Sequence, residues 1–172
     1  RGFALAGGDR KLVIAGEGEE RGALERLARE LGVADRVLLP GFISNPYPLM
    51  AAADIFVLPS DFEGYPNALI EAMALSRPVI ATNCDSGPSQ ILAGLPRKAV
   101  SGISFVENGV LVPVDDETAM AEAIRALNDE RRRADYGAKA AARASTFNAA
   151  AIKDRYWGVL REAMQAAPAR QR

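Results

Sequence analysis

Histidine is absent from the 172 residues of this chain, and cysteine occurs once, at Cys84. The absence of histidine excludes histidine general bases, the usual catalytic triads and histidine-ligated zinc. A single cysteine cannot form a disulfide within the chain, which fits the reducing environment of the cytoplasm. Any chemistry must therefore come from carboxylates, amides, lysine and arginine.

The chain also lacks a strong excess of charge and any long apolar run. Its formal net charge is −1, so bulk electrostatics provide no attraction to nucleic acid or to an anionic membrane. No apolar run reaches the roughly 18 to 20 residues needed to span a bilayer, and no signal peptide is visible. Hydrophobic residues make up 49% and charged residues 25%, which is the balance of a soluble globular protein with one domain.

Short apolar runs alternate along the chain with segments of helical periodicity. The predicted strands are 11–16, 36–41, 54–60, 77–82 and 110–114, and the predicted helices are 19–32, 45–53, 66–76, 87–94 and a helical tail to about 165. The strands are continuously apolar, which is typical of a parallel sheet covered on both faces by crossover helices. We therefore predict a doubly wound, Rossmann-like α/β domain of about five strands over residues 1–165. Residues 95–109 are expected to be irregular, and 166–172 a disordered tail.

Ligands of such sheets bind beyond the carboxyl ends of the strands, so the loops there are the candidate sites. The first loop contains Gly16-x-Gly18, but Arg21 occupies the third glycine position of a dinucleotide fingerprint. The acidic residues between them would also repel a pyrophosphate. A tight strand-to-helix turn is the favoured interpretation, although Gly16 would still let a ligand approach the backbone.

The loop after the third predicted strand holds Glu63 and leads into a helix with an open start. Pro66 suits the first helical position, which makes Tyr65 the N-cap, and tyrosine is a poor cap. The first helical amides are then unpaired at the positive end of the helix dipole, an arrangement that binds anions. Gly87 and Pro88 repeat the pattern one crossover later. Two such helix starts could bind two phosphates; the alternative is that Gly-Pro only punctuates the chain.

Seven residues separate Glu63 from Glu71. The spacing alone carries no weight, because Glu17 with Glu25 and Glu122 with Glu130 share it. Glu63 and Glu71 differ from these pairs because they flank the open start of a predicted helix.

Glu71 lies about one turn beyond Asn67 on the same helix face, and helical side chains lean toward the N-terminus. A carboxylate beside a bound phosphate suits the vicinal hydroxyls of a ribose. Glu63, on a glycine-flanked loop, is free to meet the group attached beyond the phosphates.

The stretch "SDFEGYPNALIEAMALSRPVIAT" resembles the glutamate-x7-glutamate signature of the retaining GT-B glycosyltransferases, in particular family 4. The segments "KLVIAGEGEE", "RVLLPGFIS", "SGPSQIL" and "NGVLVPVDD" are similar to the family's other blocks, in the same order, over about residues 1 to 165. The resemblance implies the nucleotide-sugar-binding C-terminal half of a two-domain enzyme. That enzyme would transfer a sugar from a nucleoside diphosphate sugar, by default a UDP-sugar, to an acceptor hydroxyl of a polysaccharide, a lipid-linked molecule or another glycoconjugate. No cofactor or metal is implied.

The resemblance also implies roles for individual residues. Glu71 would bind the ribose hydroxyls, and Glu63 would act as the catalytic-site residue that binds the hydroxyls of the donor sugar. Phe42 and Ile43 would line the base pocket. The segment that meets the sugar and phosphates would comprise Gly64, Tyr65, Pro66, Asn67, Ala68 and Leu69.

Two departures from the family pattern affect the expected activity. "RGFALA" aligns with the end of the helix after the family's first strand, so that strand, two pyrophosphate-binding cations and the acceptor-binding N-terminal domain are expected to be missing. Gln90 stands where the family commonly has glutamate, which puts a charged role there in doubt. We expect no full activity from this chain alone. The alternatives are a non-catalytic nucleotide-sugar binding module, a nucleotide-sugar epimerase of GT-B architecture, and a domain that only mediates protein contacts.

Three charged groups have simpler interpretations than function. Asp115-Asp116-Glu117 could bind a metal, but acids at a helix start more often complement its dipole. The basic stretch 125–143 fits a solvated helix face better than a peripheral contact with the inner face of a membrane carrying a lipid-linked acceptor. Arg97 and Lys98 are weaker candidates for contacts to the donor phosphates.

The remaining side chains of interest are predicted to be structural. Tyr156 and Trp157 are expected to pack on the sheet or against the missing half. Cys84 is expected to be a small buried residue.

Overall fold

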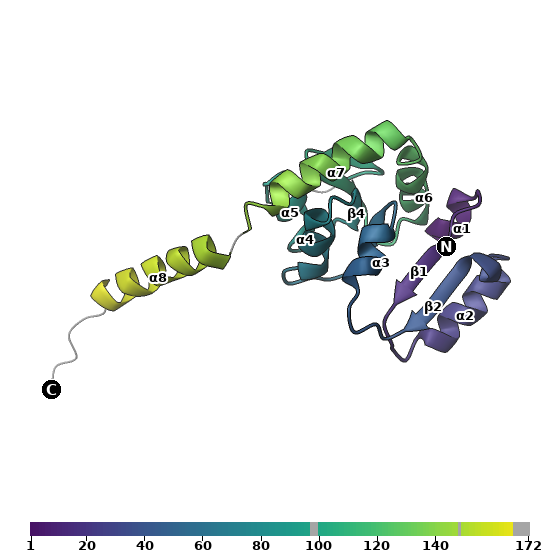
Figure 1. The fold of residues 1–172 in the computed structure, drawn as a ribbon, viewed down its shortest axis with the longest axis horizontal. Helices are drawn as coiled ribbons and strands as arrows, with labels where there is room; N and C mark the ends of the chain where they lie inside the picture. Colours follow the sequence, from purple (N-terminus) through teal and green to yellow (C-terminus); the bar gives the residue numbers. More distant parts are fainter. Residues whose placement is uncertain (97–99, 148, 167–172) are drawn as a thin grey trace.

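The computed structural model of the chain describes residues 1–96, 100–147 and 149–166. Predictions for Arg97, Lys98 and the tail from 167 lie outside the described residues. Helices and strands alternate along the chain, as predicted (Figure 1). The helices are α1 Gly2–Ala6, α2 Arg21–Glu30, the 3-10 helix η1 Ala34–Arg36, α3 Tyr47–Ala52, α4 Asn67–Ala74, α5 Pro88–Ala93, α6 Glu117–Ala126, α7 Glu130–Ala144 and α8 Ala149–Ala166.

The strands form two sheets. The larger sheet has the order β3-β4-β6-β5, with β3 (Phe56–Leu58), β4 (Val79–Thr82) and β6 (Gly109–Val112) parallel to one another. Its edge strand β5 (Ser104–Val106) runs antiparallel to β6. The smaller sheet pairs β1 (Leu12–Ala15) with β2 (Val37–Gly41) in parallel. The doubly wound α/β prediction is therefore confirmed for the fold class.

The centre of the larger sheet is buried on both faces, as its continuous apolar runs predicted. Every residue of β4 and β6 is buried. Val79, Ala81 and Leu111 belong to a core with residues of α4, α5 and α7. The alternate residues Ile80 and Val110 belong to a second core with α1 and α6. Helices on both faces thus fix the carboxyl ends of β3, β4 and β6 at one edge.

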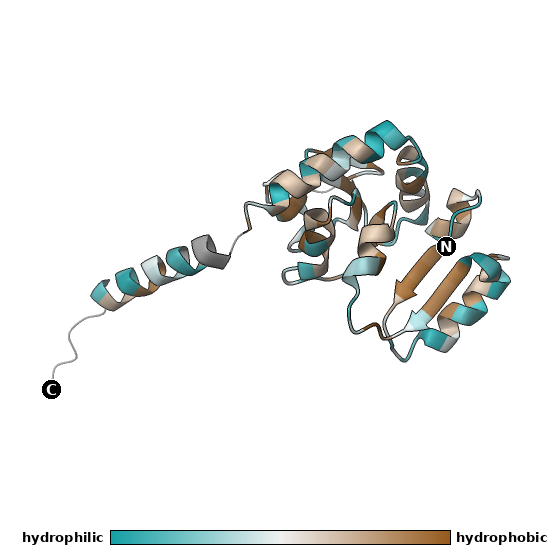
Figure 2. Cartoon of the chain, viewed as in Figure 1, coloured by the Kyte–Doolittle hydropathy of each residue, from teal (hydrophilic) through white to brown (hydrophobic). Residues whose placement is uncertain are grey.

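The smaller sheet differs from the prediction, because its strands are not fully buried. Burial alternates along β1 and β2, and Val13 and Leu38 are 40% and 47% exposed. Figure 2 shows that both strands are nonetheless apolar. Among the described strands, neither β1 nor β2 pairs with β3. In Figure 1, β1 is the strand of this pair nearer to the larger sheet, and among the described strands β1 and β3 each have an unpaired edge.

Among the local boundaries that depart from the sequence predictions, three lie at the larger sheet and the loop after β3. β5 lies inside the stretch predicted to be irregular, because a hairpin through Glu107 and Asn108 pairs it with β6. β3 is shorter than predicted, covering Phe56–Leu58 only. α4 begins at Asn67 with Pro66 as its N-cap, one residue later than expected, and no side chain caps it.

Helix α8 extends away from the rest of the molecule (Figure 1). Tyr156 and Trp157 are 66% and 53% exposed, so they do not pack on the sheet; their packing against the missing half stays a prediction. Cys84, in contrast, is 1% exposed, which confirms its buried position. Within the described residues, no helix combines the length and the apolar character that crossing a membrane requires.

Candidate nucleotide-sugar site

The candidate site lies at the carboxyl ends of β3 and β4. Leu58 pairs with Ala81, so the two strands end side by side. The loop 59–66 leads from β3 into α4, and the loop 83–87 leads from β4 into α5. The parallel register thereby places the segment with Glu63 beside the segment with Gly87.

Pro66 and Gly87, the N-caps of α4 and α5, are in direct contact. A Cβ at position 87 would stand 3.2 Å from the Cγ of Pro66, closer still to its Cδ, and 3.5 Å from the carbonyl oxygen of Gly64. Gly87 also has φ +92° and ψ −72°, a backbone conformation that side chains rarely adopt. Neither helix start has a side-chain cap. The two uncapped helix starts are therefore adjacent, as the sequence suggested.

The individual residues of the segment 64–69 differ in accessibility. Gly64, Tyr65, Asn67 and Ala68 are exposed, whereas Pro66 and Leu69 are buried. The Leu69 amide donates to the Pro66 carbonyl at 3.1 Å. Of the predicted ligand-binding amides, that of Leu69 is thus already used inside the helix.

Glu63 is half-buried and is held by two serines. Ser60 Oγ donates to Glu63 Oε1 at 2.7 Å, and Ser86 Oγ donates to the main-chain carbonyl of Glu63. Thr82 Oγ1 donates to the carbonyls of Leu58, at 3.2 Å, and Ser60. The sequence analysis missed these three hydroxyl residues. Their positions at or just beyond the carboxyl ends of β3 and β4 are the signal that could have found them.

Glu71 contrasts with Glu17 and Glu25, one of the two other glutamate pairs of equal spacing. Its half-buried side chain makes no hydrogen bond or ion pair with any residue that the structure describes. Glu17 and Glu25, by comparison, each place a carboxylate oxygen 3.1 Å from the guanidinium of Arg21. One arginine thus engages both acids of that pair, which gives them a structural role. The carboxylate of Glu71 remains available to a ligand.

The other predicted ligand contacts belong to the smaller sheet. Gly16 follows β1 with φ +135°, and its amide donates to the Gly41 carbonyl at 2.8 Å. Phe42, next in the chain, is 78% exposed, and Ile43 is half-buried. The structure therefore brings Gly16 next to the segment 41–43, at the same end of its own strands.

Asp116 and part of the basic stretch have structural roles, whereas Arg97 and Lys98 lie outside the described residues. Asp116 Oδ1 accepts a hydrogen bond of 2.8 Å from the Ala119 amide and so caps α6. Across the described part of the chain, no group of three or more Cys, Asp or Glu side chains could hold a metal ion. In the basic stretch, Arg143 donates to the carbonyls of Ile91 and Gln90 at the end of α5.

Three further hydrogen bonds support the helix-face interpretation of the basic stretch. Arg133 donates to the carbonyls of Leu127 and Asn128 at the end of α6. A hydrogen bond to Asp135 raises the pKa of Lys139 on the exposed surface of α7.

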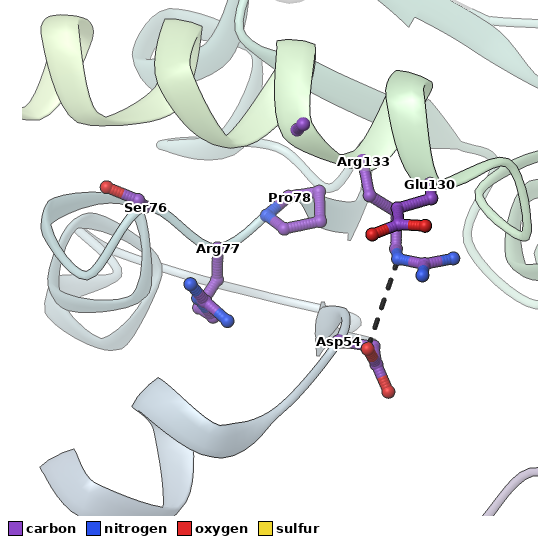
Figure 3. A pocket seen from close by; sticks show the side chains of 7 residues that line it. Asp54, Ser76, Arg77, Pro78, Glu130 and Arg133 are labelled. Carbon is purple, nitrogen blue, oxygen red and sulfur yellow. Dashed lines mark ion pairs between the residues drawn. The ribbon is translucent and has the colours of Figure 1, made fainter.

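A cavity of about 280 Å³ lies at the opposite end of the sheet, before β3 and β4. Figure 3 shows Asp54, Arg77 and Arg133 among its lining residues. Arg77 donates to the carbonyls of Leu75 and Ala53, and Arg133 approaches Asp54 at 4.0 Å. These arginines serve internal contacts, and the cavity is separate from the candidate site.

Comparisons with known proteins agree with this architecture. Residues 4–130 match the family model "Glycosyl transferases group 1". The chain is 38% identical over 149 residues to N-acetylgalactosamine-N,N'-diacetylbacillosaminyl-diphospho-undecaprenol 4-alpha-N-acetylgalactosaminyltransferase of Campylobacter jejuni, which covers 86% of this chain and 38% of that relative.

Two solved structures share the fold. Sucrose-phosphate synthase from Thermosynechococcus elongatus is similar with a TM-score of 0.75 at 29% identity, covering 96% of this chain and 42% of that one. HepE from Anabaena, in complex with UDP-glucose, is similar with a TM-score of 0.75 at 25% identity, covering 94% and 44%. This chain therefore spans 38% to 44% of the length of these relatives. The family match extends over most of its residues, and the chain belongs to the group 1 glycosyltransferases.

Proposed function

We propose that this chain is the donor-binding part of a retaining glycosyltransferase. The enzyme would move a sugar from a nucleoside diphosphate sugar, by preference a UDP-sugar, to an acceptor hydroxyl of a lipid-linked or polysaccharide molecule. The observation that carries the proposal is the placement of Glu63 and Glu71 on either side of the uncapped start of α4, which touches the start of α5 through Pro66 and Gly87.

The two helix starts would bind the diphosphate. Unpaired amides and the positive end of a helix dipole favour phosphate oxygens at such a position. The exposed residues Asn67 and Ala68 begin α4 and suit this contact. Because these groups also stabilise the diphosphate as it leaves, the reaction would need no metal ion.

The two glutamates would bind the ribose and the donor sugar, one each. Glu71, whose carboxylate has no partner among the described residues, would accept hydrogen bonds from the ribose hydroxyls. Glu63, before the helix, would accept hydrogen bonds from the donor sugar. Glycosyl transfer passes through an oxocarbenium-like state, so a carboxylate close to the sugar would also stabilise positive charge. Phe42 and Ile43 would line the base pocket.

The unpaired edges of β1 and β3 support a further part of the proposal. A parallel strand between them would join the two sheets into one and satisfy both edges. We place in that position a strand from outside the present residues, together with the cations that neutralise the pyrophosphate. The acceptor would bind to a second domain, since the relatives are more than twice as long as the matched region.

Calorimetric titration of the chain with UDP and UDP-glucose tests the proposal. Binding of UDP that depends on Glu71 is expected. Absence of binding for any nucleoside diphosphate or its sugar would instead favour a domain that mediates protein contacts. In a full-length parent, transfer to an acceptor would separate the proposal from a non-catalytic binding module, and conversion of the donor without an acceptor would indicate an epimerase.

A further inference from the structure

Glu63 is fixed at two points by hydroxyl groups from two different loops. Ser60, just beyond β3, donates from Oγ to the carboxylate oxygen Oε1 at 2.7 Å. Ser86, in the loop between β4 and α5, donates to the main-chain carbonyl of the same residue. One serine therefore orients the side chain, and the other holds the backbone.

The surroundings of Glu63 explain why such restraint matters. Its neighbours Phe62 and Gly64 are both exposed, and Phe62 is 75% exposed, so the adjacent side chains do not anchor this part of the loop. An unrestrained glutamate would have to be ordered by the ligand, and this ordering would reduce affinity. Hydrogen bonds formed before the ligand arrives remove that cost.

The bond from Ser60 leaves most of the accepting capacity of the carboxylate to a ligand. An ionised carboxylate only accepts hydrogen bonds, and its two oxygens offer about four lone pairs. Ser60 occupies one lone pair of Oε1, so Oε2 keeps both of its lone pairs, and Oε1 keeps one, for hydroxyl donors of a sugar. Ser60 is itself held, because buried Thr82 donates to its carbonyl.

The bond from Ser86 connects Glu63 to the neighbouring helix start. Ser86 immediately precedes Gly87, the N-cap of α5, which touches Pro66. Any shift of the loop 83–87 would therefore move the backbone of Glu63. Glu63, which would bind the sugar, and the start of α5, which would bind a phosphate, are therefore held at a fixed relative position.

We propose that Ser60 and Ser86 are positioning residues that hold Glu63 for the hydroxyl groups of the donor sugar, Ser60 through the carboxylate and Ser86 through the backbone. This inference rests on the proposed function, because it takes Glu63 as the residue that reads the sugar. Because Ser60 acts on the carboxylate of Glu63, its effect is confined to the gain in affinity that the sugar adds. Ser86 borders the start of α5, so its role is tested through the backbone of Glu63.

The test measures that gain, the ratio of the dissociation constant of UDP to that of a UDP-sugar. UDP-glucose, UDP-galactose and UDP-N-acetylglucosamine are titrated, and the sugar with the largest gain is used. Ser60→Ala should lower the gain by about three- to tenfold and leave the affinity for UDP unchanged. Ser60→Thr, which keeps the hydroxyl, should restore it. Ser145→Ala is the matched control, since the hydroxyl of this C-cap of α7 bonds, among the described residues, to the Ala142 carbonyl of the same helix and lies in no loop of the site.

A double-mutant cycle separates positioning from a direct contact. If Ser60 acts through Glu63, Ser60→Ala should have no effect on the gain in a chain that already carries Glu63→Ala. An equal effect in both backgrounds, or an equal loss of affinity for UDP and UDP-sugar, would overturn the inference.

Amide hydrogen exchange of residues 61–65 in the ligand-free chain provides a readout that is independent of nucleotide. Both Ser60→Ala and Ser86→Ala should increase exchange there, while Ser145→Ala should not. Unchanged exchange in both serine variants would contradict the restraint itself. If UDP binds and Glu63→Ala removes the gain while Ser60→Ala does not, only this inference fails; if neither UDP nor any other nucleoside diphosphate or its sugar binds, the proposed function fails with it.

Discussion

Gly87 lies against Pro66 so closely that a Cβ at position 87 would stand 3.2 Å from the proline Cγ and closer still to its Cδ. The contact joins two loops that are more than twenty residues apart in the chain, each leading from a strand of the larger sheet into a helix. Because both partners are N-caps, the contact fixes the spacing between two helix starts. The distance between two phosphate sites would therefore depend on this one glycine.

Gly87→Ala tests that dependence. The new methyl group overlaps the proline ring, and alanine rarely adopts φ +92°, so the loop must shift. We expect a loss of about 1–3 kcal/mol in unfolding free energy from the backbone strain. We also expect at least about tenfold weaker UDP binding, since 1.4 kcal/mol corresponds to a factor of ten. Denaturant unfolding and calorimetry measure the two effects.

Gly22→Ala is the control for this variant. Gly22 lies in α2, where a Cβ would meet only a guanidinium nitrogen of Arg26 at 3.6 Å. Alanine in a helix is favoured over glycine by roughly 0.5–1 kcal/mol, so this variant should be as stable as the parent or more stable. Unchanged UDP affinity in Gly87→Ala would show that the spacing of the helix starts has no role in binding.

Gly137→Ala should affect stability without affecting the site. Gly137 in α7 is buried, and a Cβ there would stand 3.3 Å from the carbonyl carbon of Ser76 and closer to its oxygen. The helix must move off the segment that precedes β4, which we expect to cost about 1–3 kcal/mol, as overpacking usually does. Gly158→Ala, in α8 with open space around it, should cost nothing. Thermal unfolding compares the two, and equal stability would show that α7 does not pack closely at this point.

The sequence predicted the larger sheet better than the smaller one, for a physical reason. Val79 and Ile80 lie in a continuous apolar run, and the structure covers both faces of that run with helices. The apolar run of β1 led to the same prediction, yet Val13 is 40% exposed. An apolar run shows that a face can be buried, but the segments that cover it are set by the tertiary arrangement.

At the candidate site too, features that depend on neighbouring residues in the sequence were predicted, and contacts between distant segments were not. The open start of α4 followed from the residue types around Pro66, and only its boundary was off by one residue. The serine bonds to Glu63 did not follow, because Ser86 is separated from it along the chain and is brought near by strand pairing. β5 was also missed, although its apolar residues Phe105 and Val106 precede Asn108-Gly109, a local hairpin signal.

Nucleotide binding should not depend on a divalent metal. Asp116, the best candidate in the acidic cluster, is used as the cap of α6, and the described residues contain no group that could hold a metal ion. UDP affinity measured with and without a chelator should therefore agree within about twofold, a difference well under 1.4 kcal/mol. A large loss of affinity on chelation would contradict the proposed use of helix starts in place of a metal.

The chain alone should bind nucleotide but transfer no sugar. Transfer needs donor and acceptor held in register, and the present residues match only 38% to 44% of the length of the relatives. We expect no product above background when the purified chain is incubated with UDP-sugars and candidate lipid-linked or polysaccharide acceptors. Binding of UDP in the same preparation is the control for correct folding. Detectable transfer would contradict the proposal that the acceptor binds to a second domain.

The sharpest prediction separates the two glutamates of the site. Glu71→Ala should weaken the binding of UDP and of UDP-sugar alike, because its proposed partner is the ribose that both contain. A hydrogen-bonded carboxylate at such a site should contribute roughly 1.5–3 kcal/mol, or about ten- to a hundredfold in affinity. Glu63→Ala should leave UDP binding nearly unchanged and remove the extra affinity that the sugar supplies.

Glu25→Ala is the control with the same spacing in the sequence. Glu25 is paired with Arg21 at 3.1 Å, and both side chains are substantially exposed, so removing the carboxylate should cost little stability and no ligand affinity. Titration of the three variants with UDP and with UDP-sugar gives a pattern that the geometry fixes in advance. If Glu71→Ala leaves the affinities for UDP and UDP-sugar unchanged, Glu71 does not bind the ribose. An equal loss for both ligands in Glu63→Ala would instead place that carboxylate on the nucleotide, since a group that contacts only the sugar cannot change the affinity for a ligand that lacks it.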